Sequence, residues 1–172
     1  MVEVGTVLSF IQAFGIIVGV AYYIMNIQNN QRNQQLQLET RQAQLFMPIY
    51  STYHNDEYMK AWMEIMKWKY EDYDDYMAKY SSEANPEAYI MYRKVFGYLE
   101  GVGVLVRRGL IDPSLVDDLM SGAIVSYWEK FEPFIVERRR RLNWPQVGEQ
   151  IEYLYNQIKP IAERQRRELS PP

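Results

Sequence analysis

The chain has 172 residues and a formal net charge of -3, so its overall field favours neither nucleic acid nor an acidic substrate as a partner. It contains no cysteine, which excludes disulfides, thiolate zinc sites, iron–sulfur ligation and cysteine nucleophiles. A single histidine, His54, leaves no multi-histidine metal site within one chain. We therefore expect one small domain with an accessory segment, and no cofactor or metal.

An uncharged apolar stretch runs from Val4 to Met25 near the N-terminus. Its 22 residues correspond to about 33 Å of helix, and the hydrocarbon core of a bilayer is about 30 Å thick. A secretory signal carries Lys or Arg before its apolar run, whereas Glu3 precedes this one, although Gly19-Val20-Ala21 resembles a cleavage site. The pattern favours a membrane anchor over residues 1–25, rather than a signal peptide or a buried core helix.

The charges that flank this stretch predict its orientation. Lys and Arg collect on the cytoplasmic side of membrane helices, and here Arg32 and Arg41 follow the stretch while none precedes it. We therefore expect a single-pass protein of the cell (inner) membrane, with its N-terminus outside and its soluble domain in the cytoplasm. Tyr22 and Tyr23 would then lie at the inner interface, where aromatic rings are favoured.

Three residues inside the stretch, Gln12, Gly15 and Gly19, suggest helix packing in the membrane. Glycines four residues apart let two backbones approach closely, and a Gln amide in hydrocarbon needs a polar partner. Glycine is also frequent in membrane helices in general, so a tolerated pair explains the same pattern. Three alternatives stay open: self-association as a homo-oligomer, docking on a larger membrane protein, and no packing role.

Asn and Gln dominate the next segment, residues 26–48. Such low complexity occurs in disordered tracts, yet Gln, Leu, Arg, Glu and Ala are good helix formers, and no Gly or Pro occurs before Pro48. Leu38 and Leu45 are seven residues apart, but two positions are too few to predict a coiled coil. We interpret the segment as a polar helical stalk that continues the membrane helix.

Residues 49–162 carry helical signals throughout, and no segment alternates convincingly with a period of two. The cleanest signal is the last, where apolar residues recur at spacings of four and three, as in an amphipathic helix. Its apolar positions are Val147, Ile151, Leu154, Ile158 and Ile161. The sequence therefore predicts an all-α fold: a small bundle of about five helices, followed by a basic, Pro-ended tail over residues 163–172.

Capping signals predict where the helices of this bundle begin and end. Gly109 and Gly122 are expected to end two helices, the second being a short one that starts at Asp112. A further helix over 123–141 is expected to kink at Pro133. A polar capping residue followed by an acid or by Pro marks a helix start. The three starts are Asn55-Asp56, Asn85-Pro86 and Asp112-Pro113.

The order of several segments in this part is distinctive. WKYEDYDDYMAKY is followed by Asn85-Pro86-Glu87, then by LEGVGVLVRRGLIDPSLVDDLM, then by SYWEKFEPFI with an Arg run, and finally by EYLY. This order resembles a family of single-span prokaryotic membrane proteins catalogued as domain of unknown function 4760. The likeness covers Tyr58 to Tyr155. It implies a membrane-tethered helical domain with no established activity and no catalytic residues to carry over.

Residues that could support catalysis or bind a metal are few. His54 would be the base of any nucleophilic triad, but it lies beside a helix start and no GxSxG elbow is present, so capping or hydration is favoured. An acidic cluster could gather Ca²⁺ or Mg²⁺, but it lacks the loop spacing and the Gly of an EF-hand and is interpreted as a solvated face. It consists of Glu71, Asp72, Asp74 and Asp75.

A second group of glycines occurs in the run Gly101-Val102-Gly103. Phosphate-binding loops place such glycines after a strand and add a Lys followed by Ser or Thr, and this run has neither. We therefore expect these glycines to let another helix pack closely.

The run Arg138 to Arg141 is the strongest candidate for a binding site. Four consecutive residues sweep more than one helical turn, so they cannot all face one buried partner. Beside an inner leaflet such a patch could bind anionic lipid headgroups, with about 1 kcal/mol contributed by each arginine close to the surface. An acidic protein is another possible partner, and nucleic acid is the least favoured one. The alternative is pairing with the domain's own acids, namely Glu129, Glu132, Glu137 and the Asp cluster.

The sequence favours a membrane-anchored, non-enzymatic helical interaction module, acting as adaptor, accessory subunit or local regulator. Its 15 Tyr and 4 Trp, with its Arg residues, are types enriched at protein interfaces. The alternatives are a membrane-tethered enzyme with a carboxylate or tyrosine site, and a basic patch that binds anionic lipid or nucleic acid.

Overall fold

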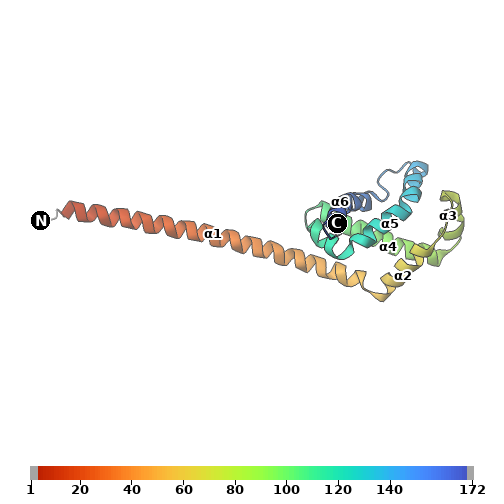
Figure 1. Ribbon diagram of the computed structural model, residues 1–172, viewed down its shortest axis with the longest axis horizontal. Coiled ribbons are helices and arrows are strands. Elements are labelled where there is room, and N and C mark those ends of the chain that lie inside the picture. Colours follow the sequence, from red (N-terminus) through yellow and green to blue (C-terminus); the bar gives the residue numbers. More distant parts are fainter. Residues whose placement is uncertain (1–3, 170–172) are drawn as a thin grey trace. The chain divides into compact units, whose positions relative to one another are not determined.

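The computed structural model describes residues 4–169, and within them the chain forms six α-helices and no strand, so the all-α prediction is confirmed (Figure 1). Two compact units divide the chain, one ending at Ala43 and the other beginning at Gln44. The helices are α1 (Val4–Tyr53), α2 (Asp56–Lys67), α3 (Tyr73–Tyr80), α4 (Pro86–Arg107), α5 (Pro113–Leu142) and α6 (Glu149–Leu169).

The first unit consists of most of α1, which is a single helix of 50 residues. Its N-terminal part carries exposed apolar side chains, and by length and composition the helix is able to cross a membrane. Gln12, Gly15 and Gly19 lie on this part and are exposed, and no described atom lies within 4 Å of a Cβ built on either glycine. The Asn/Gln-rich residues continue the same helix without a break, as the sequence predicts.

The last turns of α1 belong to the second unit, which begins at Gln44. Phe46 is buried there, and Leu45 and Ile49 pack against the same core. Pro48 lacks a backbone N–H and does not end the helix, which continues to Tyr53. The sequence predicts that the stalk ends at Pro48. Apolar contacts before and after the proline keep the chain helical through this position.

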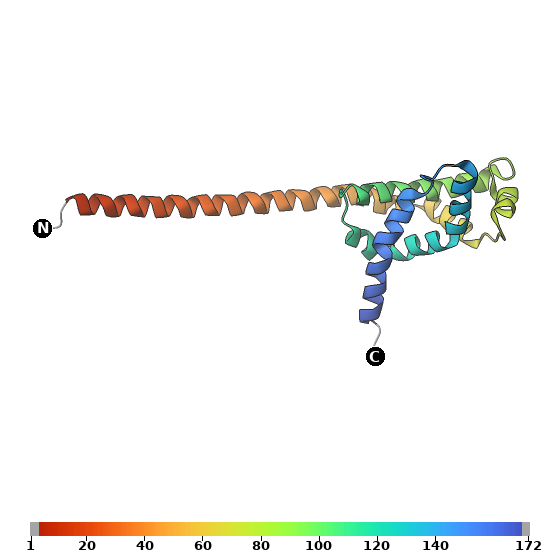
Figure 2. The ribbon, with the colours of Figure 1, turned by 90° about the horizontal axis from the view of Figure 1, so that it is seen from above.

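The core of the second unit lies where α6 packs against both α4 and α5. Helix α2 lies against α4, and α3 contacts α4 and α5 (Figure 2). The cleanest amphipathic pattern of the sequence supplies one wall of this core, since Ile151, Leu154 and Ile158 are fully buried. Leu99 from α4 and Phe131 from α5 complete the contact, so the predicted bundle is held mainly by its three longest helices after α1.

Helix α5 differs from the sequence prediction at Gly122. The predicted short helix does not end there, because α5 is continuous from Pro113 to Leu142. A glycine inside a helix costs about 1 kcal/mol relative to alanine, whereas each large apolar side chain buried nearby contributes about 1.5–3 kcal/mol. Met120 and Ile124 are such side chains, so packing overrides the local stop signal. Figure 2 shows α5 changing direction in its C-terminal half, which contains Pro133.

The three predicted helix starts are confirmed by capping contacts. In each case a side-chain oxygen of the capping residue accepts a hydrogen bond from a free backbone N–H in the first turn. The pairs are Asn55 with Glu57 at 2.8 Å, Asn85 with Ala88 at 3.1 Å, and Asp112 with Ser114 at 2.8 Å. Gly109 follows α4 with a φ of 66°, the left-handed conformation expected of a glycine just past a helix end.

The contact between α4 and α6 is closest at Gly103. A Cβ built on Gly103 would lie 2.3 Å from the carbonyl oxygen of Gln150, so only glycine fits. Beside it, the Glu100 carboxylate accepts hydrogen bonds from the N–H groups of Gln150 at 3.0 Å and Ile151 at 2.9 Å. These N–H groups belong to the first turn of α6, so Glu100 caps α6 from another helix. Close helix packing at this glycine run is thereby confirmed for Gly103, whereas Gly101 is exposed.

Candidate functional site at the end of α5

The basic run forms the last turns of α5, where positive side chains interact favourably with the free carbonyls of the helix. The helix ends at Leu142, and the capping residue Asn143 has a φ of 48°, the left-handed conformation found just past helix ends. Since successive side chains on a helix point in directions about 100° apart, the four guanidinium groups have different surroundings. Each is therefore described separately.

Arg139 ties the end of α5 to the following loop and to α6. Its Nε donates a hydrogen bond to the carbonyl of Val147 at 2.6 Å, and its Nη1 forms an ion pair with Glu152 at 2.7 Å. Its guanidinium also lies 5.9 Å from the centre of the Trp128 ring. With 18% of its side chain exposed, Arg139 is the most enclosed of the arginines that form ion pairs here, and its role is to hold two helices together.

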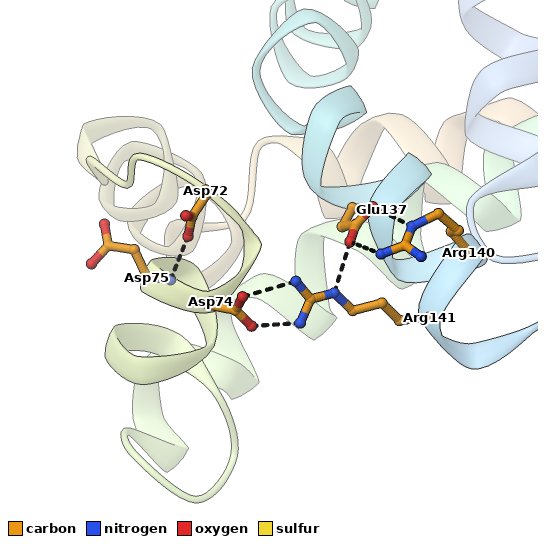
Figure 3. A network of polar contacts seen from close by, with 6 residues as sticks. All are labelled: Asp72, Asp74, Asp75, Glu137, Arg140 and Arg141. Carbon is orange, nitrogen blue, oxygen red and sulfur yellow. Dashed lines mark hydrogen bonds and ion pairs between the residues drawn. The ribbon is translucent and has the colours of Figure 1, made fainter.

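Arg140 and Arg141 share the carboxylate of Glu137, as Figure 3 shows. Arg141 also forms two parallel hydrogen bonds to Asp74 of α3, at 2.5 and 2.8 Å. Its guanidinium lies 4.5 Å from the centre of the Tyr73 ring. Paired hydrogen bonds between guanidinium and carboxylate have a fixed geometry, so this contact adds a directional link between α3 and α5.

The same contacts lower the pKa values of the acids. Hydrogen bonds from Arg140 and Arg141 lower the pKa of Glu137 to about 2, and the hydrogen bonds from Arg141 lower the pKa of Asp74. Both acids are therefore ionised at neutral pH. Because these groups are solvent-exposed, salt screens the network, and an external anion would have to compete with acids already in place.

The remaining acids of the cluster have local structural contacts. Asp72 caps α3 by accepting a hydrogen bond from the N–H of Asp75 at 2.9 Å (Figure 3). Asp75 accepts hydrogen bonds from the N–H of Glu71 at 3.0 Å and from Lys79 at 2.7 Å. Among the residues that the structure describes, no group of three His, Cys, Asp or Glu side chains could hold a metal ion.

Arg138 differs from its three neighbours because no described residue forms an ion pair with it. Its guanidinium lies 5.8 Å from the centre of the Phe134 ring. It also lines a pocket together with Tyr76 and Tyr92, whose side chains are almost fully buried. The predicted patch is thus divided: three arginines are paired within the domain, and one faces a pocket rimmed by tyrosines.

The other residues singled out from the sequence lie elsewhere. Gln12, Gly15 and Gly19 belong to the first unit. His54 is exposed at the end of α1, with its Nδ1 3.1 Å from the carbonyl of Tyr50. Of the acids named as internal partners of the basic run, Glu137 and Asp74 fill that role, whereas Glu129 pairs with Lys159 at 3.4 Å.

A contact that sequence reasoning missed joins α5 to the end of α2. The Lys130 ammonium donates hydrogen bonds to the carbonyls of Met66 at 3.1 Å and Trp68 at 2.7 Å. In return, the Tyr70 hydroxyl donates a hydrogen bond to the Lys130 carbonyl at 2.8 Å. These partners are about 60 positions apart in the chain, so no local pattern could have indicated the pairing.

A shallow apolar groove of about 530 Å³ lies between the last turns of α1 and the middle of α4. Ile49, Tyr98 and Leu105 contribute side chains to it. Gly97 and Gly101 are exposed along its α4 side, and no described atom lies within 4 Å of a Cβ built on either. None of the described residues that line the groove is charged.

The fold is that of an all-α protein with an apolar N-terminal helix and a helical bundle. The model of the family described as "Domain of unknown function (DUF4760)" matches residues 9–158, so the chain belongs to that family. The match includes most of the apolar stretch, all of α2 to α5 and about the first half of α6. No curated protein and no solved structure matches the chain.

Proposed function

We propose that the chain is a membrane-anchored, non-enzymatic interaction module that serves as an accessory subunit of a larger membrane protein. Its apolar N-terminal segment spans the cell (inner) membrane once, with the N-terminus outside and the bundle in the cytoplasm. Arg32 and Arg41, which follow the span, support this orientation. The observation that carries the proposal is the uncharged groove between α1 and α4. An exposed apolar surface on a helical bundle favours a protein partner that covers it.

The chemistry of the groove favours a helix as its occupant. Gly97 and Gly101 are one helical turn apart, so their missing side chains leave a continuous strip of exposed backbone along α4. A partner helix can approach such a strip more closely than a row of larger side chains, as membrane helices do at small-xxx-small motifs. Ile49 and Leu105 then supply apolar contact on either side. The occupant is therefore a helix with an apolar, uncharged face.

The shape of the groove favours a different protein rather than a second copy of this chain. A two-fold dimer pairs a surface with itself, and a concave surface does not fill a concave surface. A second copy would have to insert another part of its structure, which produces an open-ended chain of contacts. A contact with a different protein requires neither a self-complementary surface nor an open-ended chain of copies. Self-association through Gly15 and Gly19 in the membrane remains a separate proposal that concerns another surface.

Site-specific crosslinking tests the accessory-subunit proposal. A photoreactive amino acid replaces Gly101 in the full-length protein in its native membranes, and crosslinked products are identified by mass spectrometry. The expected product is one other membrane protein, crosslinked through a helix. Gly122 provides the matched control position, because it is an exposed glycine within α5 that has no described atom within 4 Å and does not line the groove.

A second arm uses affinity isolation in mild detergent. Gly101→Leu fills the groove, and we expect it to remove the crosslinked partner from the eluate, whereas Gly122→Leu retains it. A crosslink from position 101 to another copy of this chain would replace the heteromeric proposal by self-association. A partner that remains bound to Gly101→Leu would show that the groove is not the docking surface.

The membrane orientation has its own test. Protease is added to right-side-out and to inverted membrane vesicles that contain the full-length protein, with an epitope at the C-terminus. The proposal predicts cleavage of the bundle and loss of the epitope only in inverted vesicles. Cleavage in right-side-out vesicles would place the bundle outside the cytoplasm.

A further inference from the structure

Helix α4 carries two pairs of adjacent basic residues, one beyond each end of the uncharged groove. The pairs are Arg93-Lys94 and Arg107-Arg108. In each pair one member binds an acid of another helix. Lys94 forms an ion pair with Glu57 of α2 at 2.8 Å, and Arg107 forms one with Glu149 of α6. The bundle therefore uses one positive charge at each end of the groove for its own packing.

The second member of each pair is exposed and has no such partner. Among the described residues, no acid forms an ion pair with Arg93 or Arg108, and the Arg93 guanidinium lies 5.4 Å from the centre of the Phe96 ring. Glu100 is the one acid of α4 between the two arginines, and it accepts hydrogen bonds from the first N–H groups of α6. The two arginines thus leave positive charge on the outer side of α4.

These arginines continue the side of α4 that forms the groove. Successive residues lie about 100° apart around a helix, so Arg93, Gly97, Gly101 and Arg108 fall within about 80° of one another. Gly97 and Gly101 line the groove. Arg93 and Arg108 are 15 residues apart, which corresponds to about 22 Å along the helix axis. The uncharged surface of α4 is therefore bounded by a positive charge at each end.

We propose that the partner helix in this groove carries an acidic residue on either side of its uncharged face, and that the two acids pair with Arg93 and Arg108. The inference rests on the accessory-subunit proposal and specifies the chemistry of the partner. An uncharged face alone fits many helices, whereas two flanking acids about four turns apart fit a much narrower set. Exposed ion pairs are individually weak, so this pairing contributes specificity and a faster association more than affinity.

The pairing also restricts how the partner lies on α4. Two helices that cross at about 20° stay adjacent over several turns, whereas helices that cross at about 50° diverge quickly on both sides of the contact. Only the smaller angle lets one helix reach both Arg93 and Arg108. Since an acid is required at each end, the partner can run parallel or antiparallel to α4.

The sequence of the crosslinked partner gives a direct test. The photoreactive amino acid at position 101 marks the partner residue over the groove, and fragmentation of the crosslinked peptide in the mass spectrometer identifies that residue. Arg93 lies eight residues before position 101, and Arg108 lies seven residues after it. We expect Asp or Glu about seven or eight residues away on each side of the marked residue. A partner that lacks either acid overturns the inference.

Charge reversal tests the pairing itself in the full-length protein in its native membranes. Arg93→Glu combined with Arg108→Glu places like charges opposite the proposed acids, and we expect the yield of the crosslink from position 101 to fall by at least about tenfold. The double variant Lys67→Glu, Lys69→Glu changes the net charge equally at exposed side chains that do not line the groove, and should leave the yield unchanged. Tryptophan fluorescence during urea unfolding confirms that each double variant is folded.

An exchange of charges completes the experiment. Replacing the two partner acids by Lys should restore the crosslink to the Arg93→Glu, Arg108→Glu chain and weaken it to the unmodified chain. A crosslink to another protein that keeps its full yield in the reversed chain overturns this inference and leaves the accessory-subunit proposal intact. The absence of any crosslinked protein, or a crosslink to phospholipid alone, overturns both.

Discussion

Replacement of Gly103 by alanine is the sharpest test of how the bundle is packed. The added Cβ would lie 2.3 Å from the Gln150 carbonyl oxygen and 2.7 Å from its carbon, whereas ordinary contacts begin near 3.4 Å. Both atoms belong to the backbone of α6, so no side-chain rotation relieves the clash. The first turn of α6 must therefore move away from α4 by roughly 1 Å.

Three contributions determine the expected size of the effect. Alanine in place of glycine favours the helix by up to about 1 kcal/mol. Overpacking of a close contact costs about 1–3 kcal/mol. Moving the first turn of α6 also stretches the two hydrogen bonds that Glu100 accepts, each contributing about 0.5–1.5 kcal/mol. We expect Gly103→Ala to lower the free energy of unfolding by about 2–4 kcal/mol, since the unfavourable contributions exceed the favourable one.

Tryptophan fluorescence of the full-length protein during urea unfolding is a suitable assay, because all four Trp residues lie in the bundle, between positions 62 and 144. The fluorescence therefore reports the unfolding of the bundle and not structural changes in the apolar N-terminal segment. Gly122→Ala is the matched control: its Cβ meets open space within α5, and we expect it to raise the free energy of unfolding by up to about 1 kcal/mol. Equal effects of the two substitutions, in sign and size, would refute the close contact between α4 and α6.

Three further outcomes are expected. The carboxyl pKa of Glu137, measured by NMR titration, should be about 2 and should rise towards its ordinary value in an Arg140→Gln, Arg141→Gln double variant. Because the pKa of Glu137 is lower in the folded than in the unfolded state, the group stabilises the fold above its unfolded pKa. This stabilisation is lost as the pH falls towards 2. Glu100→Ala should cost about 1–3 kcal/mol in urea unfolding by leaving two N–H groups of α6 without their acceptor, whereas Glu100→Gln, which retains an acceptor oxygen, should cost less. Lys130→Met should also lower the free energy of unfolding, by about 1–3 kcal/mol, because the last carbonyls of α2 lose their donor, and an unchanged midpoint would show that water replaces the ammonium there.

The helical class, the helix starts and the apolar N-terminal segment were predictable because they depend on residues within about one turn of each other. A capping side chain reaches amides two or three positions away, as Asn85 does with Ala88. An amphipathic helix repeats its apolar residues every three or four positions, and Ile151, Leu154 and Ile158 are buried accordingly. Gly122 was predicted to stop a helix, because a local signal does not include the energy of packing distant side chains.

The candidate sites depend on contacts that the sequence does not encode locally. Arg141 pairs with Asp74, 67 positions away, and this pairing separates it in role from Arg138, which lines the pocket. Gly101 and Gly103 are two residues apart and look equivalent in the sequence, yet they point about 200° apart around α4.

The sequence by itself thus determined that the chain forms helices, where most of them begin, and that its first helix is apolar enough to cross a membrane. Only the tertiary structure decided which glycine is enclosed by α6 and which lines an open groove, and which arginine has an internal acid. The physical reason is one of range: helix propensity and capping act over about four residues, whereas burial and ion pairing act between helices that the fold alone brings together.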